Sequence, residues 1–238
     1  MKITTVLFDL DGTLLPMEQD KFVKCYFGLL AKKLASHGYE PRKLLGAIWQ
    51  GIEAMIKNNG KKTNEQVFWD TFSAIYGKEA LGDIPVFKDF YEKDFAQVKT
   101  SCGFDEKAAW AVKTIKDMGL RVALATNPLF PDTATRQRIE WAGLSPEDFE
   151  LYTTYEKSRH SKPNPDYYRD VLSSLGASAE ECLMVGNDTG DDMVAQSLGM
   201  KVFLMPRWLI NKDNRDISTY PQGDFDRLVK YVKQQIRI

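Results

Sequence analysis

The stretch that decides the fold is Phe8-Asp9-Leu10-Asp11-Gly12-Thr13-Leu14, which follows directly on an apolar run at residues 3–8. Two carboxylates two residues apart at the end of an apolar strand are costly unless each is solvated, paired or bound to a cation. An Asp-Gly turn capped by Asp9 would explain one of them as structure. The complete string after a strand favours a functional site instead.

Short apolar runs recur along the chain at residues 3–8, 122–125, 151–154, 182–185 and 202–205. Nearly continuous apolar character is typical of parallel strands that are buried on both faces. Helical stripes between the later runs end at Gly119, Gly143 and Gly176, where glycine can terminate a helix. Strands alternating with helices predict an α/β fold with a doubly wound parallel sheet, across which a last helix carrying Phe225 and Ile236 is expected to pack.

Residues 17–100 have a different pattern, with four amphipathic stripes and no convincing strand. The third stripe opens with a capping box, Thr63-x-x-Gln66, and the fourth runs from Phe87 to Val98. We expect residues 17–100 to form an α-helical cap inserted into a catalytic core of residues 1–16 and 101–238. An insertion after the first strand lies at the ligand crevice of such a sheet, so it is placed to act as a lid hinged near residues 15–17 and 100–103.

Composition narrows the class of protein. Lysine and arginine number 32 against 33 acids, so the chain lacks the overall basic character of a nucleic-acid binder. No uncharged apolar run approaches the ~18 residues that span a membrane, and no secretory signal is visible at the N-terminus. Three cysteines without a C-x-x-C pair indicate free thiols. These features predict a cytoplasmic protein without nucleic-acid or membrane partners, and they leave monomer and dimer equally open.

The opening string resembles the first motif of the haloacid-dehalogenase superfamily, D-x-D-G-T, and three later segments resemble the other motifs in order. VALATN at residues 122–127 resembles the second, Lys162 within SKPNPD at residues 161–166 the third, and MVGNDTGDD at residues 184–192 the acidic fourth. The helical insertion is placed like the α-helical cap of subclass I members. The resemblance covers essentially the whole chain and implies a Rossmann-like core, but it says little about the substrate.

What the resemblance implies is a phosphohydrolase that works through an aspartyl-phosphate intermediate. Asp9 would be the nucleophile, and Asp11 would protonate the leaving group and later activate water. Thr126, Asn127 and Lys162 would bind the phosphoryl group, although Thr126 alone reads as a turn residue and Lys162 as a solvated loop lysine. The cofactor would be Mg²⁺, held by the Asp9 carboxylate, the Asp11 backbone carbonyl and one residue of the fourth motif.

That third metal ligand is open, because the fourth motif can be read in two registers. Many members carry G-D-S-x-x-D, and in that register Asn187 replaces the metal-binding aspartate, with Asp191 as its partner. One residue further on, Asp188 and Asp192 keep the same spacing with both carboxylates intact. Mg²⁺ prefers anionic oxygen, which favours Asp188 as the ligand with Asp192 in support.

Three functional alternatives follow from the same residues. A sugar-phosphate phosphomutase shares all four motifs and is the second choice. A non-catalytic phosphometabolite-binding protein is less favoured because Asp9 and Asp11 are both intact, and dehalogenases usually lack an acid at the position of Asp11. The substrate is expected to be a small phosphorylated metabolite. Four aromatic residues of the insertion could line its pocket, although aromatic residues at helical spacing more often fill a helical core: Trp49, Trp69, Phe72 and Tyr76.

Overall fold

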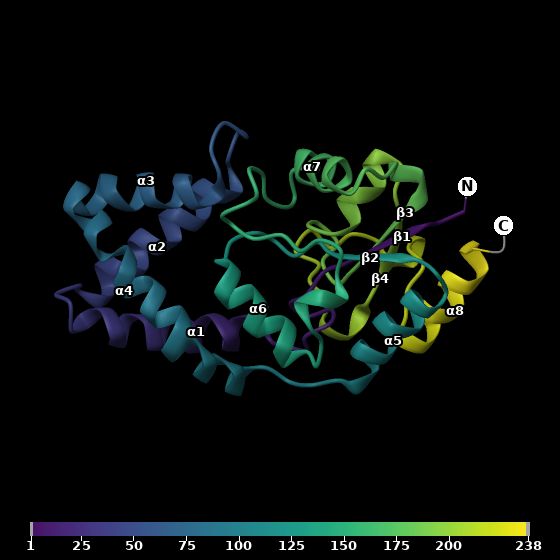
Figure 1. Cartoon of the computed structure of the whole chain (residues 1–238), viewed down its shortest axis with the longest axis horizontal. Coiled ribbons are helices and arrows are strands. Elements are labelled where there is room, and N and C mark those ends of the chain that lie inside the picture. Colours follow the sequence, from purple (N-terminus) through teal and green to yellow (C-terminus); the bar gives the residue numbers. More distant parts are fainter. Residues whose placement is uncertain (1, 237–238) are drawn as a thin grey trace.

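Four parallel strands form the central sheet of the computed structural model, which describes residues 2–236 (Figure 1). The order across the sheet is β2-β1-β3-β4, with Phe8 in register with Leu124 on one side and Val185 on the other. The predicted α/β fold with a parallel sheet is therefore confirmed. The strands are β1 (Thr5–Phe8), β2 (Arg121–Leu124), β3 (Cys182–Gly186) and β4 (Lys201–Leu204).

Side chains alternate between two apolar layers, one on each face of the sheet. Val6 and Phe8 pack in one cluster with α5 and α8, whereas Leu7 packs in the other with α7. Figure 1 shows α7 on the opposite side of the sheet from α5 and α8. Burial on both faces explains why the strands lack a polar side. The core helices are α5 (Glu106–Asp117), α6 (Asp132–Trp141), α7 (Pro165–Leu175) and α8 (Phe225–Ile236).

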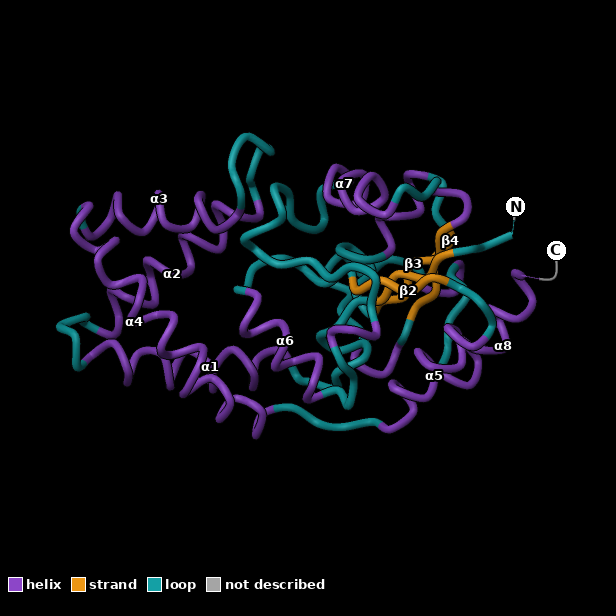
Figure 2. The backbone as a smooth tube through the Cα atoms, in the orientation of Figure 1, coloured by secondary structure: helices purple, strands orange, loops and turns teal. Residues whose placement is uncertain are grey.

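The segment 17–100 is helical and extends away from the sheet toward one end of the molecule (Figures 1 and 2). At the start of α3 the capping box is formed in both directions, between the Thr63 hydroxyl and the Gln66 N–H and between the Gln66 side chain and the Thr63 N–H. Its four α-helices are α1 (Gln19–Ala35), α2 (Pro41–Ile56), α3 (Asn64–Tyr76) and α4 (Ile84–Asp89).

The fourth stripe is not one continuous α-helix as predicted. Of the stripe residues Phe87, Tyr91, Phe95 and Val98, Tyr91 is only partly buried, and its neighbour Phe90 is buried instead, five residues before Phe95. The chain accommodates the five-residue step with a π-helical turn at Phe90–Asp94, between α4 and a 3₁₀ segment at Phe95–Ser101.

The chain enters and leaves the helical segment at one place. Met17 pairs with Cys102 in an isolated antiparallel bridge, and the Gly103 N–H donates to the Pro16 carbonyl at 2.7 Å. Both connections to the core therefore lie side by side, where the hinges were predicted. The boundaries of the cap and its movement stay predictions.

Residues 151–154, which were predicted to form a fifth strand, make only a single bridge from Tyr152 to Leu124. Two backbone hydrogen bonds flank that bridge, from the Leu124 N–H to the Leu151 carbonyl and from the Thr153 N–H to the Leu124 carbonyl, and the pairing stops there because β2 ends at Leu124. The segment turns toward the site instead, where the Thr153 hydroxyl donates to the Thr126 carbonyl at 2.6 Å. Within residues 2–236, no helix combines the length and the apolar character that a membrane span requires.

Candidate active site

The polar residues singled out in the sequence meet at the carboxyl edge of the sheet. Asp9 follows β1, Thr126 lies two residues after β2, and Asn187 and Asp188 follow β3. Because β1 lies between β2 and β3, their loops meet around Asp9. This is the edge at which open parallel sheets bind ligands.

The Asp9 carboxylate is buried and held at both oxygens. Oδ1 accepts a hydrogen bond from Lys162 Nζ at 2.9 Å, and Oδ2 accepts one from the Thr13 hydroxyl at 3.1 Å. A carboxylate has about four acceptor positions, so these two contacts fix its orientation and leave lone pairs for a further partner. Asp9 also lines a cavity that reaches from the sheet edge to the helical segment.

Lys162 lies between two carboxylates, since its ammonium group also donates to Asp192 Oδ1 at 2.6 Å. Burial alone lowers the pKa of Lys162, but the charges of Asp192 and Asp9 raise it well above its ordinary value. Burial raises the pKa of Asp192 to about 7, against the opposing effect of Lys162. Lys162 is thus a buried, fixed positive charge beside Asp9, not a solvated loop residue.

In the fourth motif, Asn187 and Asp188 make different contacts. Asn187 uses both ends of its amide in structural bonds: Oδ1 accepts from the Thr13 hydroxyl at 3.0 Å, and Nδ2 donates to the Trp208 carbonyl at 2.6 Å. It packs so closely on Gly12 that a β-carbon there would lie 2.4 Å from Nδ2. Asp188 Oδ1 accepts from the N–H groups of Gly190 and Asp191 at 2.7 and 3.0 Å.

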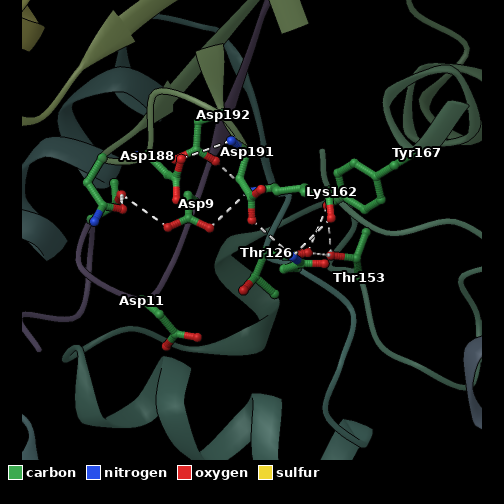
Figure 3. Close-up of polar contacts among 12 residues, drawn as sticks. Asp9, Asp11, Thr126, Thr153, Lys162, Tyr167, Asp188, Asp191 and Asp192 are labelled. Carbon is green, nitrogen blue, oxygen red and sulfur yellow. Dashed lines mark hydrogen bonds and ion pairs between the residues drawn. The ribbon is translucent and has the colours of Figure 1, made fainter. Parts of the chain in front are cut away.

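Asp192 connects this loop to the lysine. Its Oδ2 accepts from the Asp188 N–H at 2.9 Å, while Oδ1 binds Lys162. Only glycine fits at position 186, because a β-carbon there would lie within 2.5 Å of three atoms of the Asp192 side chain. Figure 3 shows Asp9, Asp188 and Asp192 grouped together, with Asp188 beside Asp9.

Asp11 is set apart from this group in Figure 3. Its carboxylate forms an ion pair with Arg138 on α6, a residue whose side chain is fully buried and stacks at 4.4 Å on the ring of Phe130. Burial raises the pKa of the Asp11 carboxyl, and the charge of Arg138 opposes that shift. One oxygen, Oδ1, is buried without a hydrogen-bond partner, yet Asp11 still lines the same cavity as Asp9.

The remaining predicted residues lie at the same edge. Thr126 is buried, and its carbonyl accepts hydrogen bonds from Thr153 and from the Tyr167 hydroxyl, which fix the loop after β2. Asn127 Nδ2 donates to Asp191 Oδ2 at 3.1 Å. Asp191 is therefore tied to the phosphate-binding candidates, and its pKa is raised by burial and next by Asp188.

The oxygen donors at this edge suit a hard cation such as Mg²⁺. Among residues 2–236, no three His, Cys, Asp or Glu side chains are close enough to hold a metal by themselves. The ligand set implied by the sequence needs only two carboxylates, because its third member is the Asp11 carbonyl. Asp9 and Asp188 both line the cavity and lie beside one another, which fits that set (Figure 3).

One cavity of about 450 Å³ connects these polar residues with the helical segment. Of the four aromatic residues named as possible lining, Trp49 and Trp69 line it, but Phe72 and Tyr76 do not. Sequence reasoning missed most of the aromatic lining and also Arg138. The available signal for Arg138 was its place four residues after Ala134 and four before Ala142, on the buried face of α6.

Both the sequence and the fold are similar to those of known proteins. The family model for haloacid dehalogenase-like hydrolases matches residues 3–199. Pyrophosphatase PpaX of Bacillus cereus (strain AH820) is 29% identical over 205 residues, which cover 84% of this chain and 82% of that protein.

Two solved structures share the fold over nearly their whole length. A HAD phosphatase from Thermococcus onnurineus has a TM-score of 0.60 at 18% identity, with 98% of each chain covered. The HAD-hydrolase YfnB of Bacillus subtilis, whose crystal structure has magnesium bound, has a TM-score of 0.56 at 21% identity, with 100% of each chain covered. With the family model spanning most of the sequence, this chain belongs to the haloacid dehalogenase-like hydrolases.

Proposed function

We propose that the chain is a Mg²⁺-dependent phosphohydrolase that cleaves a small phosphomonoester through an aspartyl-phosphate on Asp9. The observation that carries the proposal is the orientation of the Asp9 carboxylate, which is held by Lys162 and Thr13 at the wall of a cavity. A buried carboxylate beside a fixed ammonium group is suited to receive a phosphoryl group, whose negative oxygens the same ammonium group can stabilise.

In the first step, an oxygen of Asp9 forms a bond to phosphorus while the bond from phosphorus to the leaving oxygen breaks. Asp11 in its protonated form gives that leaving oxygen a proton, and then takes one from the water that hydrolyses the acyl phosphate. Lys162 stays protonated throughout, because the negative charges of Asp192 and Asp9 raise its pKa. Bound Mg²⁺ would supply further positive charge against the phosphoryl oxygens.

Asp11 must leave Arg138 before it can act, because its carboxylate is paired there and set apart from Asp9. We propose that residues 17–100 act as the cap. Closure of the cap over the bound substrate would accompany the movement of the Asp11 side chain away from Arg138. Closure would also exclude water from the phosphoryl group during transfer.

The test is a phosphate-release screen with Mg²⁺ over sugar phosphates, phosphoglycolate, nucleotides, pyrophosphate and alkyl and aryl phosphates. We expect multiple turnovers on at least one monoester and none with Asp9→Asn protein. Binding of a phosphate ester without any release of phosphate would instead identify a binding protein without turnover. An isomeric sugar phosphate formed without free phosphate would identify a phosphomutase.

A further inference from the structure

The cavity in front of Asp9 has two chemically different halves. The half formed by the core carries the carboxylates, Lys162 and Thr126, whereas the half formed by residues 17–100 is almost entirely apolar. The volume of the whole cavity, about 450 Å³, falls within the range of about 300–1,000 Å³ usual for small-molecule sites. A substrate whose phosphoryl group lies at Asp9 therefore places its leaving group against the apolar half.

Aromatic side chains make up much of this apolar wall. Phe22 and Tyr26 on α1 face Phe130 of the core, with ring centroids 6.0 and 5.3 Å from it. Trp69 on α3 packs edge-on against Phe87 at 5.1 Å. These rings contact one another within the helical core, and their free edges also line the cavity.

The charges around the cavity are distributed unevenly. Among the described lining residues from 17–100, Glu18 is the only charged one, and it is negative. The cations at the cavity come from the core: Lys162, which already holds Asp9 and Asp192, and Arg207, whose side chain is two-thirds exposed and paired with Asp105 at 2.9 Å. A second anionic group on the substrate would be buried against apolar side chains without a cation from the helical segment, which is unfavourable.

From these observations we infer that the substrate is a phosphomonoester whose leaving group is uncharged and apolar, of the size of an aromatic ring or a medium-length alkyl chain. The inference rests on the proposed function, since it assigns the cavity to the leaving group of that reaction. It separates this chain from enzymes of small substrates that carry a second anionic group, such as pyrophosphate or phosphoglycolate.

The test uses full-length wild-type protein with Mg²⁺ and ethyl, butyl and hexyl phosphate. Their leaving groups are primary alcohols of similar acidity, so differences in kcat/KM report on contacts with the alkyl chain. We expect kcat/KM to rise by about two- to fourfold for each added methylene, as each is transferred from water to an apolar surface. Benzyl phosphate should exceed pyrophosphate and phosphoglycolate by at least about tenfold. A flat alkyl series, or a preference for pyrophosphate or phosphoglycolate, would overturn the inference.

Two variants on α2 locate the effect. Ile52 lines the cavity and is partly buried, whereas Ile56, one turn further on, is exposed and does not line it. Ile52→Arg should flatten the alkyl series and raise the relative rate on phosphoglycolate, and Ile56→Arg should leave the series as in the wild type. Equal alkyl series in both variants would contradict the assignment. If Ile52→Arg does not fold, the wild-type series decides alone.

Failure of the proposed function has a separate signature. A protein that releases no phosphate from any monoester, activated 4-nitrophenyl phosphate included, is not a phosphohydrolase. Calorimetric titration of Asp9→Asn protein with hexyl and ethyl phosphate then tests the cavity without turnover. Four methylenes should tighten binding by about 16- to 250-fold. Equal affinities would reject the apolar pocket.

Discussion

Asn64, the first residue of α3, donates a hydrogen bond of 2.9 Å from Nδ2 to the hydroxyl of Ser161, the residue before Lys162. The same amide group donates to the Pro128 carbonyl at 3.0 Å, and its Oδ1 accepts from Asn58 Nδ2 at 2.8 Å. The side chain is fully buried. The helical segment therefore also contacts the core away from its two covalent connections, beside the lysine that holds Asp9.

Asn64→Ala should loosen this contact. The change leaves the Pro128 carbonyl without that donor and the Asn58 amide without that acceptor, at a cost of about 1–3 kcal/mol in the free energy of unfolding. Hydrogen exchange should accelerate in residues 58–64 and 155–161. Asn59→Ala is the matched control, because Asn59 is exposed and its Oδ1 accepts only from the Lys61 N–H of the same loop. Equal exchange rates in the two variants would show that the contact does not hold the cap.

Asp9→Asn should lower kcat by at least about a thousandfold on every phosphate substrate, because an amide does not attack phosphorus. The similar size of the side chain should preserve packing, and Lys162 keeps its contact with Asp192. Thermal unfolding and circular dichroism check the fold, and phosphate release checks the rate. Appreciable turnover by well-folded Asp9→Asn protein would remove Asp9 from the nucleophile role.

Asp11→Asn should have an effect that depends on the leaving group. Primary alkoxides need a proton as they depart, so the rate on hexyl or benzyl phosphate should fall by about 10²–10⁴-fold. 4-Nitrophenolate departs without protonation, so 4-nitrophenyl phosphate should lose much less rate. The comparison is made within one protein, and any change in folding caused by leaving Arg138 without its carboxylate affects both substrates alike. Equal losses would mean that Asp11 does not act as the leaving-group acid.

The sheet was predictable because its signal is local. Each strand is a short apolar run, and burial on both faces leaves that run without polar interruptions. The segment 151–154 has the same apolar character but meets only the last residue of β2, so its pairing depends on where a neighbouring strand ends, which its own sequence does not reveal. The π-helical turn at Phe90–Asp94 buries Phe90 in place of Tyr91, and the regular helical spacing of Phe87, Tyr91 and Phe95 did not indicate it.

The candidate site was likewise predictable only where its residues belong to local motifs. Residues that belong to strand ends and motifs, such as Asp9 and Lys162, lie together as the order of motifs implied. The pairing of Asp11 with Arg138 joins residues 127 positions apart, and no periodicity links them. The aromatic cavity likewise depends on how α1, α2 and α3 pack, whereas the sequence shows only that their aromatic residues recur at helical spacing.

The metal ligand from the fourth motif remains a prediction, and the contacts of the two residues make it testable. Both ends of the Asn187 amide already form hydrogen bonds, with Thr13 and with Trp208. Asp188, by contrast, accepts two backbone hydrogen bonds at one oxygen only, and it lines the same cavity as Asp9. Asp188→Asn keeps an oxygen for those N–H groups and removes only the charge. We therefore expect it to raise the Mg²⁺ concentration for half-maximal activity by at least about tenfold.

Asn187→Ala is the control, since it should lower the melting temperature through the loss of its two structural bonds while the Mg²⁺ requirement stays within about threefold of the wild type. Binding can be read without turnover, because a ligand that binds only the folded state stabilises it, by about 2.7 kcal/mol at one hundred times its Kd. Mg²⁺ should thus raise the melting temperature of the wild type and of Asn187→Ala, and a chelator should reverse the shift. Asp188→Asn should show a much smaller shift at the same Mg²⁺ concentration. If Asn187→Ala loses the shift and Asp188→Asn retains it, the metal is bound in the other register, with Asn187 and Asp191.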